Sequence, residues 1–175
     1  MNEVLKNIIE RRSIRKFKPD PIPQEILDDI LESGLYAPNG RGYQNTIMIL
    51  VTNKEVRDYI SKFNCEIGGW KEDFDPFYGA PYMIIVLAKK DWNNRVYDGS
   101  LVMGNLMLEA HSLGIGSCWI HRAKEEFESK WGKDFLKNLG ITEEYEGIGH
   151  CALGYIDGEN PKPPKRKENR VFFVK

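Results

Sequence analysis

Two short apolar runs and one long amphipathic segment most constrain how this chain can fold. The runs "IMILV" and "MIIVLA" are bounded by polar or turn-forming residues and have the length of buried strands. The segment "DGSLVMGNLMLEAHSL", residues 98–113, repeats apolar residues at helical spacing and is followed by Gly114, which predicts a central helix. Strands this apolar need helices over their faces, so we expect an α+β fold.

The remaining elements are expected from periodicity and from proline and glycine. Helices are expected over residues 3–11, from Pro23 to about Gly34, over 54–62 and around 124–139. Strands are expected over 46–52, 82–88, 115–120 and 149–156, and residues 64–81 form a long connection of a kind that is usually functional or mobile. The terminal "VFFV" could pair in a sheet. The sequence predicts one domain, residues 1–175, with helices on both faces of one mixed sheet.

Overall composition excludes several classes of protein. There are 25 Lys and Arg against 26 Asp and Glu, so nothing draws the whole chain to nucleic acid or to an anionic membrane. The apolar runs are about a third of the roughly 20 residues that span a bilayer, and the N-terminus has no apolar signal region. Cys65, Cys118 and Cys151 show no C-x-x-C spacing, which favours a reducing compartment. We therefore expect a cytoplasmic protein.

Two patterns resemble cofactor or metal motifs but lack their context. "GIGHCA" and "GIGSCW" are close to the dinucleotide fingerprint, yet both precede strands, whereas the true motif opens a helix. A metal site could be assembled from Cys118 and His121 with His150 and Cys151. Neighbouring residues on a strand face opposite sides, however, so His150 and Cys151 would not converge without a bulge. We therefore predict no metal site.

The stretch "ERRSIRKF" at residues 10–17 is the strongest local signal. Its arginines are either a solvated charged turn or a cradle in which guanidinium groups and a hydroxyl bind an anion, of which phosphate is the commonest. The residues alone leave both readings open. The second basic run, "KPPKRK", is restrained by prolines and could supply the other half of such a cradle.

Five segments in this order resemble the nitroreductase family of FMN-dependent oxidoreductases. They are "RRSIRKF", "IPQEILDDILESGLYAPNG", "YGAPYMIIVLA", "DGSLVMGNLMLEAHSLGIGSCWI" and "ALGYIDGENPKPPKRK", and together they cover nearly the whole chain. The resemblance implies a three-layer α-β-α sandwich whose mostly antiparallel sheet is flanked by helices. It also implies a homodimer in which the C-terminal strand is exchanged between subunits.

The resemblance also assigns residues to the cofactor. FMN would be bound at its phosphate, ribityl chain and pyrimidine edge by Arg11, Arg12, Ser13 and Arg15, with Lys165 and Arg166 joining at the phosphate. The loop Pro38, Asn39, Gly40 and Gln44 would reach the flavin of the partner subunit. The strand Ser117, Cys118, Trp119, Ile120 and His121 would lie along the flavin ring, with a backbone amide near N5. Gly42, Asn45, Met103 and His121 depart from the residues that are frequent in the family.

The implied activity is hydride transfer from NADH or NADPH, through flavin N5, to small electron-poor acceptors such as nitroaromatics or quinones, by a ping-pong mechanism. No catalytic side chain is needed, since the cofactor carries the chemistry. The alternatives are a specialised flavoenzyme of the same fold, such as a reductive dehalogenase or a flavin-consuming enzyme, and a non-catalytic anion- or metal-binding module.

Overall fold

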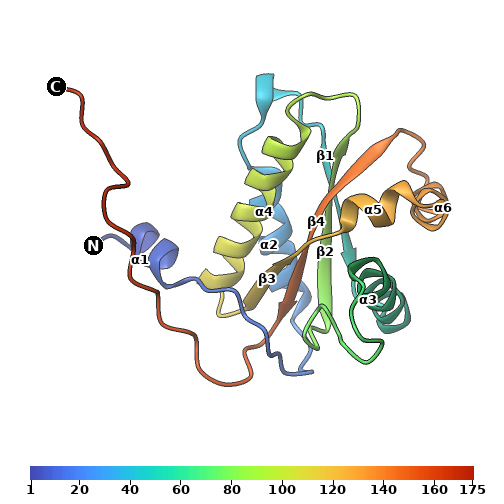
Figure 1. Cartoon of the computed structure of the whole chain (residues 1–175), viewed down its shortest axis with the longest axis horizontal. Coiled ribbons are helices and arrows are strands. Elements are labelled where there is room, and N and C mark those ends of the chain that lie inside the picture. The colour runs from blue at the N-terminus through green and yellow to red at the C-terminus, as the bar shows by residue number, and fades with distance from the viewer.

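The computed structural model describes residues 1–175 and has a four-stranded sheet at its centre (Figure 1). The strands are β1 (Thr46–Val51), β2 (Tyr82–Lys89), β3 (Gly116–Ile120) and β4 (Tyr145–Gly154), in the order β1-β2-β4-β3. Every neighbouring pair of these strands is antiparallel, and the only parallel pairing is an isolated bridge between Ser13 and Ser117. The expected α+β sandwich with a mostly antiparallel sheet is confirmed.

The two faces of the sheet carry separate cores, because successive side chains of a strand point to opposite sides. From β2, Met83 and Ile85 pack with α3 (Lys54–Gly68), α5 (Ala123–Glu128) and α6 (Lys130–Asn138). Ile84 and Val86 pack on the other face with α2 (Gln24–Leu35) and α4 (Arg95–Ser112). Both faces of the central strands are therefore buried, which explains the unbroken apolar run in β2.

A bulge and a glycine contact place α5 close to the sheet. The register of β2 against β4 shifts so that Val86 pairs with Gly149 and Leu87 with Gly147, which leaves Ile148 as the extra residue. A Cβ atom added at Gly147 would lie 2.2 Å from the carbonyl oxygen of Ala123. Only glycine at residue 147 allows α5 to begin directly against β4.

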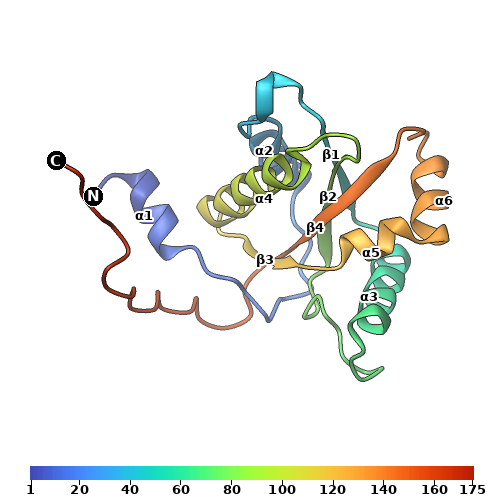
Figure 2. The same cartoon turned by 45° about the horizontal axis from the view of Figure 1, so that its top comes forward.

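The N-terminal helix and the C-terminal segment extend away from this body. Helix α1 (Glu3–Glu10) has no buried residue and is tied to α4 by a hydrogen bond from Asn7 Nδ2 to the Leu108 carbonyl, 2.9 Å long. The chain after Gly158 has no regular secondary structure and passes beside α1 in both views (Figures 1 and 2), where the Asn160 amide donates to the Glu10 carbonyl. In this single chain "VFFV" is not a strand, and Phe172 is 83 % exposed.

Several boundaries differ from the sequence-based expectation. Helix α3 continues to Gly68 and ends where Gly69 adopts a left-handed conformation, so it takes up the start of the expected connection. The helical stretch after residue 123 divides into α5 and α6, because Ser129 is extended and its hydroxyl caps α6 by accepting from the Gly132 amide. Strand β4 begins at Tyr145, earlier than expected. Pro23 is the N-cap of α2 instead of its first helical residue. No helix is both long and apolar enough to cross a membrane.

Candidate functional site

The segment that follows α1 lies against the start of β3. Ser13 and Ser117 form the isolated parallel bridge, and the Ile14 amide donates to the Ser117 carbonyl over 2.9 Å. The Ser13 hydroxyl lies beside the Cys118 thiol. Two groups of residues that are about a hundred positions apart in the sequence are thereby brought together, as the resemblance implied.

Arg11 and Ser117 carry polar atoms at this junction that have no partner in the protein. Nη1 of Arg11 and Oγ of Ser117 are both buried and make no hydrogen bond. Burial and the neighbouring Arg12 charge lower the pKa of the Arg11 guanidinium. A buried donor without an acceptor is costly, and an anion placed here would satisfy the donor and offset the charge. The junction is therefore suited to an anionic ligand such as a phosphate.

The other two arginines of the cluster differ in what they contact. The Arg12 guanidinium donates to the carbonyls of Ile9 and Glu10 and so closes the C-terminal end of α1. Arg15 is exposed, and its guanidinium carbon lies 6.0 Å from the centroid of the Tyr78 ring. Neither Arg11 nor Arg15 forms an ion pair with a carboxylate of the chain. Arg11 and Arg15 are the members of the cluster that remain available to a ligand.

The two cysteines beside this cluster are not suited to act as nucleophiles. Burial raises the pKa of the Cys118 thiol, although the charges of Arg15 and Arg11 and the Ser13 hydroxyl act in the opposite direction. Cys151 is fully buried, and its pKa is raised strongly by that burial. Both thiols stay protonated and unreactive at neutral pH. His150 and Cys151 face opposite sides of the sheet, and no group of three or more His, Cys, Asp or Glu side chains could hold a metal.

Buried polar side chains hold the backbone at the C-terminal end of β3. Asn64 Nδ2 donates to the His121 carbonyl over 2.8 Å and to Oε1 of Glu126 over 2.6 Å. The other oxygen of Glu126 lies 2.7 Å from Nε2 of His150. Asn64, Glu126 and His150 have no solvent exposure at all. The backbone at residues 121–122 is therefore fixed by a network reaching across α3, α5 and β4.

His121 itself points away from this network. Its side chain is exposed and lines a cavity of about 420 Å³ together with Arg122, Lys124, Glu125 and Ile148. Its ring centroid is 6.0 Å from that of Trp119. The side chain of His121, one of the residues that depart from those frequent in the family, therefore faces an open space.

The loop around Gly40 is fastened to the N-terminal end of α4. Oδ1 of the buried Asp98 accepts from the Gly40 amide over 3.0 Å, and Oδ2 accepts from Nε1 of Trp92 over 2.7 Å. Asn39 Oδ1 accepts from the Gln44 amide over 2.9 Å. Sequence reasoning missed Asp98 and Trp92, although an acidic residue in the first turn of the predicted central helix was a usable signal.

The predicted cofactor-binding residues do not form one cluster within a single chain. Arg11 lies near His111 in the last turn of α4, whereas Gly40 contacts Asp98 in the first. The two ends are separated by about 20 Å of helix, at 1.5 Å per residue. Pro38, Asn39 and Gln44 belong to the Gly40 end, and Ser13, Ser117 and Cys118 belong to the Arg11 end. Lys165 and Arg166 lie in the exposed C-terminal segment, where no ion pair or hydrogen bond joins them to Arg11.

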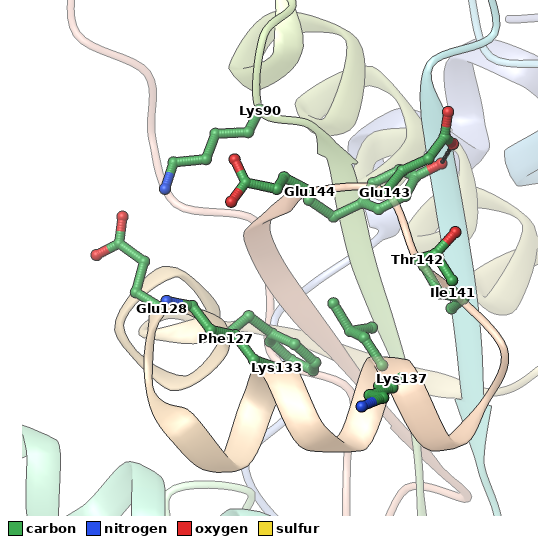
Figure 3. Close-up of a pocket in the computed structure, with 11 residues that line it drawn as sticks. Lys90, Phe127, Glu128, Lys133, Lys137, Ile141, Thr142, Glu143 and Glu144 are labelled. Atoms are coloured by element: carbon green, nitrogen blue, oxygen red, sulfur yellow. Dashed lines mark hydrogen bonds between the residues drawn. The ribbon is translucent and has the colours of Figure 1, made fainter.

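A further cavity of about 340 Å³ lies between β4, α5 and α6, apart from both groups (Figure 3). Its rim mixes charges of both signs, with Lys133 and Lys137 from α6 and with Lys90, Glu143 and Glu144 around the β4 end. Nζ of the neighbouring Lys89 lies 2.8 Å from Oε1 of Glu143, so positive charge here is matched by carboxylates.

Comparison with known proteins identifies the class. The model of the nitroreductase family matches residues 8–67 and 69–155, which is most of the chain. The protein belongs to the nitroreductase family, as the sequence motifs indicated.

Individual relatives are similar to this chain along nearly its whole length. The chain is 29 % identical over 189 residues to an FMN reductase (NAD(P)H) of Bacillus subtilis, which covers 98 % of this chain and 73 % of that protein. A crystal structure of a nitroreductase with bound FMN from Bacteroides fragilis matches with a TM-score of 0.91 and 29 % identity, over 100 % of both chains. A nitroreductase with bound FMN from Desulfitobacterium hafniense matches with a TM-score of 0.88 and 28 % identity, also over 100 % of both chains.

Proposed function

We propose that this protein is an FMN-dependent oxidoreductase that takes hydride from NADH or NADPH and passes it to small electron-poor acceptors such as nitroaromatics or quinones. The general class, an NAD(P)H-dependent oxidoreductase with FMN as cofactor, is confirmed by the family and by relatives that are named for these activities. The choice of acceptor and the ping-pong order of the two half-reactions belong to the proposal. So does the cytoplasmic location, which three free cysteines favour.

The single observation that carries the proposal is the unsatisfied Arg11–Ser117 junction. The residues there fit the phosphate end of FMN, since Arg11 supplies a buried donor without a partner, and Ser13 and Ser117 supply hydroxyls beside it. Arg15, next along the segment, would face the ring end of the cofactor. When it is bound, FMN supplies hydride transfer at N5, and the protein positions the ring and its charge.

A complete site requires a second copy of the chain. The loop Pro38–Gln44 and the Arg11 junction lie at opposite ends of α4, so one chain cannot place both against one flavin. Large apolar side chains are exposed on the outer face of α4 and on α1, including Tyr97 at 71 % and Val4 at 69 %. A soluble chain seldom leaves such a surface uncovered. We therefore propose a homodimer in which the C-terminal segment, with Lys165 and Arg166, reaches the partner.

The test is a pair of half-reactions on protein purified with FMN. Anaerobic addition of NADH or NADPH should bleach the flavin absorbance, and a nitroaromatic or quinone should restore it in a separate step. Sedimentation at micromolar concentration should show a dimer. A protein that binds no flavin, or a monomer that keeps it, would contradict the proposal.

A further inference from the structure

Arg122, directly after β3, is held in an unusual position. Its backbone is left-handed, with φ of 79°, a conformation that few residues other than glycine adopt. Its guanidinium carbon lies 4.2 Å from the centroid of the Trp70 ring, which is a close cation–π contact. No ion pair or hydrogen bond of the chain engages this guanidinium group. Arg122 is therefore a fixed positive charge whose donors are unused.

Trp70 is itself restrained, so the contact is well defined. A Cβ atom added at Gly68 would come within 2.8 Å of the indole ring, which shows that the backbone of Gly68 packs against Trp70. Trp70 also packs edge-on against Phe74 at 5.1 Å between centroids. Packed against Gly68 and Phe74, the partly exposed Trp70 ring positions the Arg122 guanidinium and leaves the edges of that group free to donate.

The space beside Arg122 is more cationic than anionic. The cavity of about 420 Å³ is lined by His121, Arg122 and Lys124, and Glu125 is its only carboxylate. The same turn follows the strand that, under the proposed function, lies along the flavin ring. Its positive charge is thus adjacent to the place where an acceptor would stack.

We propose that Arg122 selects acceptors in which a planar ring carries an anionic substituent such as a carboxylate, and that Trp70 is the positioning residue for Arg122. This inference rests on the proposed function and names its substrate class. A carboxylate can accept two N–H groups from one guanidinium edge, a geometry that a neutral amide reproduces only in part. Of two acceptors of equal shape, the protein should therefore prefer the one that carries a carboxylate to the one that is neutral.

The experiment compares 4-nitrobenzoate with 4-nitrobenzamide as acceptors for the FMN-loaded dimer. The ratio of their kcat/KM values should fall about tenfold in Arg122→Gln, as expected for the loss of one partly exposed charge-assisted contact. Trp70→Leu should lower the ratio in the same direction, and Trp70→Phe should restore part of it. Lys137→Gln, which removes one positive charge at the distant cavity of Figure 3, is the matched control and should leave the ratio unchanged.

Calorimetry with benzoate and benzamide, which are not reduced, gives a readout independent of turnover. Benzoate should bind more tightly than benzamide to the wild type, and the difference should vanish in Arg122→Gln. An equal loss for charged and neutral ligands, or a loss confined to FMN or NAD(P)H binding, would overturn the inference. If the wild type bound no FMN the proposed function would fail, whereas equal binding of benzoate and benzamide to flavin-loaded protein would contradict only this step.

Discussion

Arg57 is buried and Arg11 is half-buried, but their guanidinium groups have opposite surroundings. Arg57 donates from Nε to the Ala80 carbonyl at 2.9 Å, lies 3.2 Å from Asp58 and is paired with Asp75. Arg11 has a buried nitrogen with no acceptor, and it forms no ion pair with a carboxylate. One arginine is neutralised within the fold, and the other has a nitrogen without a partner in the chain.

Under the proposed function, this difference separates an arginine that stabilises the fold from one that binds the cofactor. Asp75 does more than pair with Arg57, since its oxygens also accept from the Ser61 hydroxyl and from the amides of Phe77 and Gly79. That network fixes the connection between α3 and β2 without any ligand. At the Arg11 junction a buried guanidinium nitrogen lacks an acceptor, so under the proposed function an added anion would complete the site.

Removing Arg57, the arginine that is paired within the fold, should have the largest effect on stability. Arg57→Ala leaves Asp75 without its cation, and we expect a loss of about 3 kcal/mol in the free energy of unfolding. Urea unfolding of the wild type and the variant, both without FMN, measures this. Arg11→Ala in the same assay should change stability little, and a similar loss in both would remove the distinction between the two arginines.

The loop around Gly40, at the N-terminal end of α4, is held by hydrogen bonds within the chain, as Arg57 is. Asp98→Ala leaves the Gly40 amide and the Trp92 indole nitrogen without their acceptor, and should cost about 2 kcal/mol of stability. Urea unfolding gives the value. Asp134→Ala, which removes an exposed carboxylate from α6, is the control and should change stability little. A cost at Asp98 no greater than that at Asp134 would mean that Gly40 is not held by this side chain.

The Asp75 network should also show in the pH dependence of stability. Burial alone would raise the pKa of Asp75, but the hydrogen bonds from Arg57 and Ser61 outweigh it and lower the pKa below the ordinary value. Such a carboxyl group stabilises the fold above its unfolded pKa, and the contribution is lost as pH falls through the folded pKa. The stability difference between wild type and Asp75→Asn should thus be constant from pH 7 to about pH 5 and shrink in more acidic solution. A difference that grew on acidification would contradict this assignment.

The smallest expected effect belongs to His121. Because the carbonyl of His121 is held by Asn64 and its side chain faces the cavity, His121→Gly should keep FMN affinity while shifting relative kcat/KM among a quinone, a nitroaromatic and a third acceptor by a few-fold, under about 1 kcal/mol. Uniform losses with weaker flavin binding would instead make His121 a cofactor contact.

Sequence reasoning predicted most of the fold, whereas its cofactor-binding residues stay a prediction. The apolar runs of β1 and β2 and the periodicity of α4 were readable because burial imposes them directly. Sequence reasoning could not predict the contacts of Arg122 with Trp70 and of Asn64 with the His121 carbonyl. Each contact joins segments far apart in sequence through geometry that no local pattern encodes. The different contacts of Arg11 and Arg12 were also hidden, because both residues occur in one basic run and no local pattern distinguishes them.

The central claim, that the unpartnered Arg11 and Arg15 bind FMN, Arg11 at its phosphate and Arg15 toward its ring, is tested most directly by flavin titration of the apoprotein. Arg11→Ala and Arg15→Ala should each weaken FMN binding by about 1.5 to 3 kcal/mol while the unfolding free energy of the apoprotein stays close to that of the wild type. Lys137→Ala should bind FMN as the wild type does. Unchanged affinity in both arginine variants, or an equal loss in Lys137→Ala, would contradict the account.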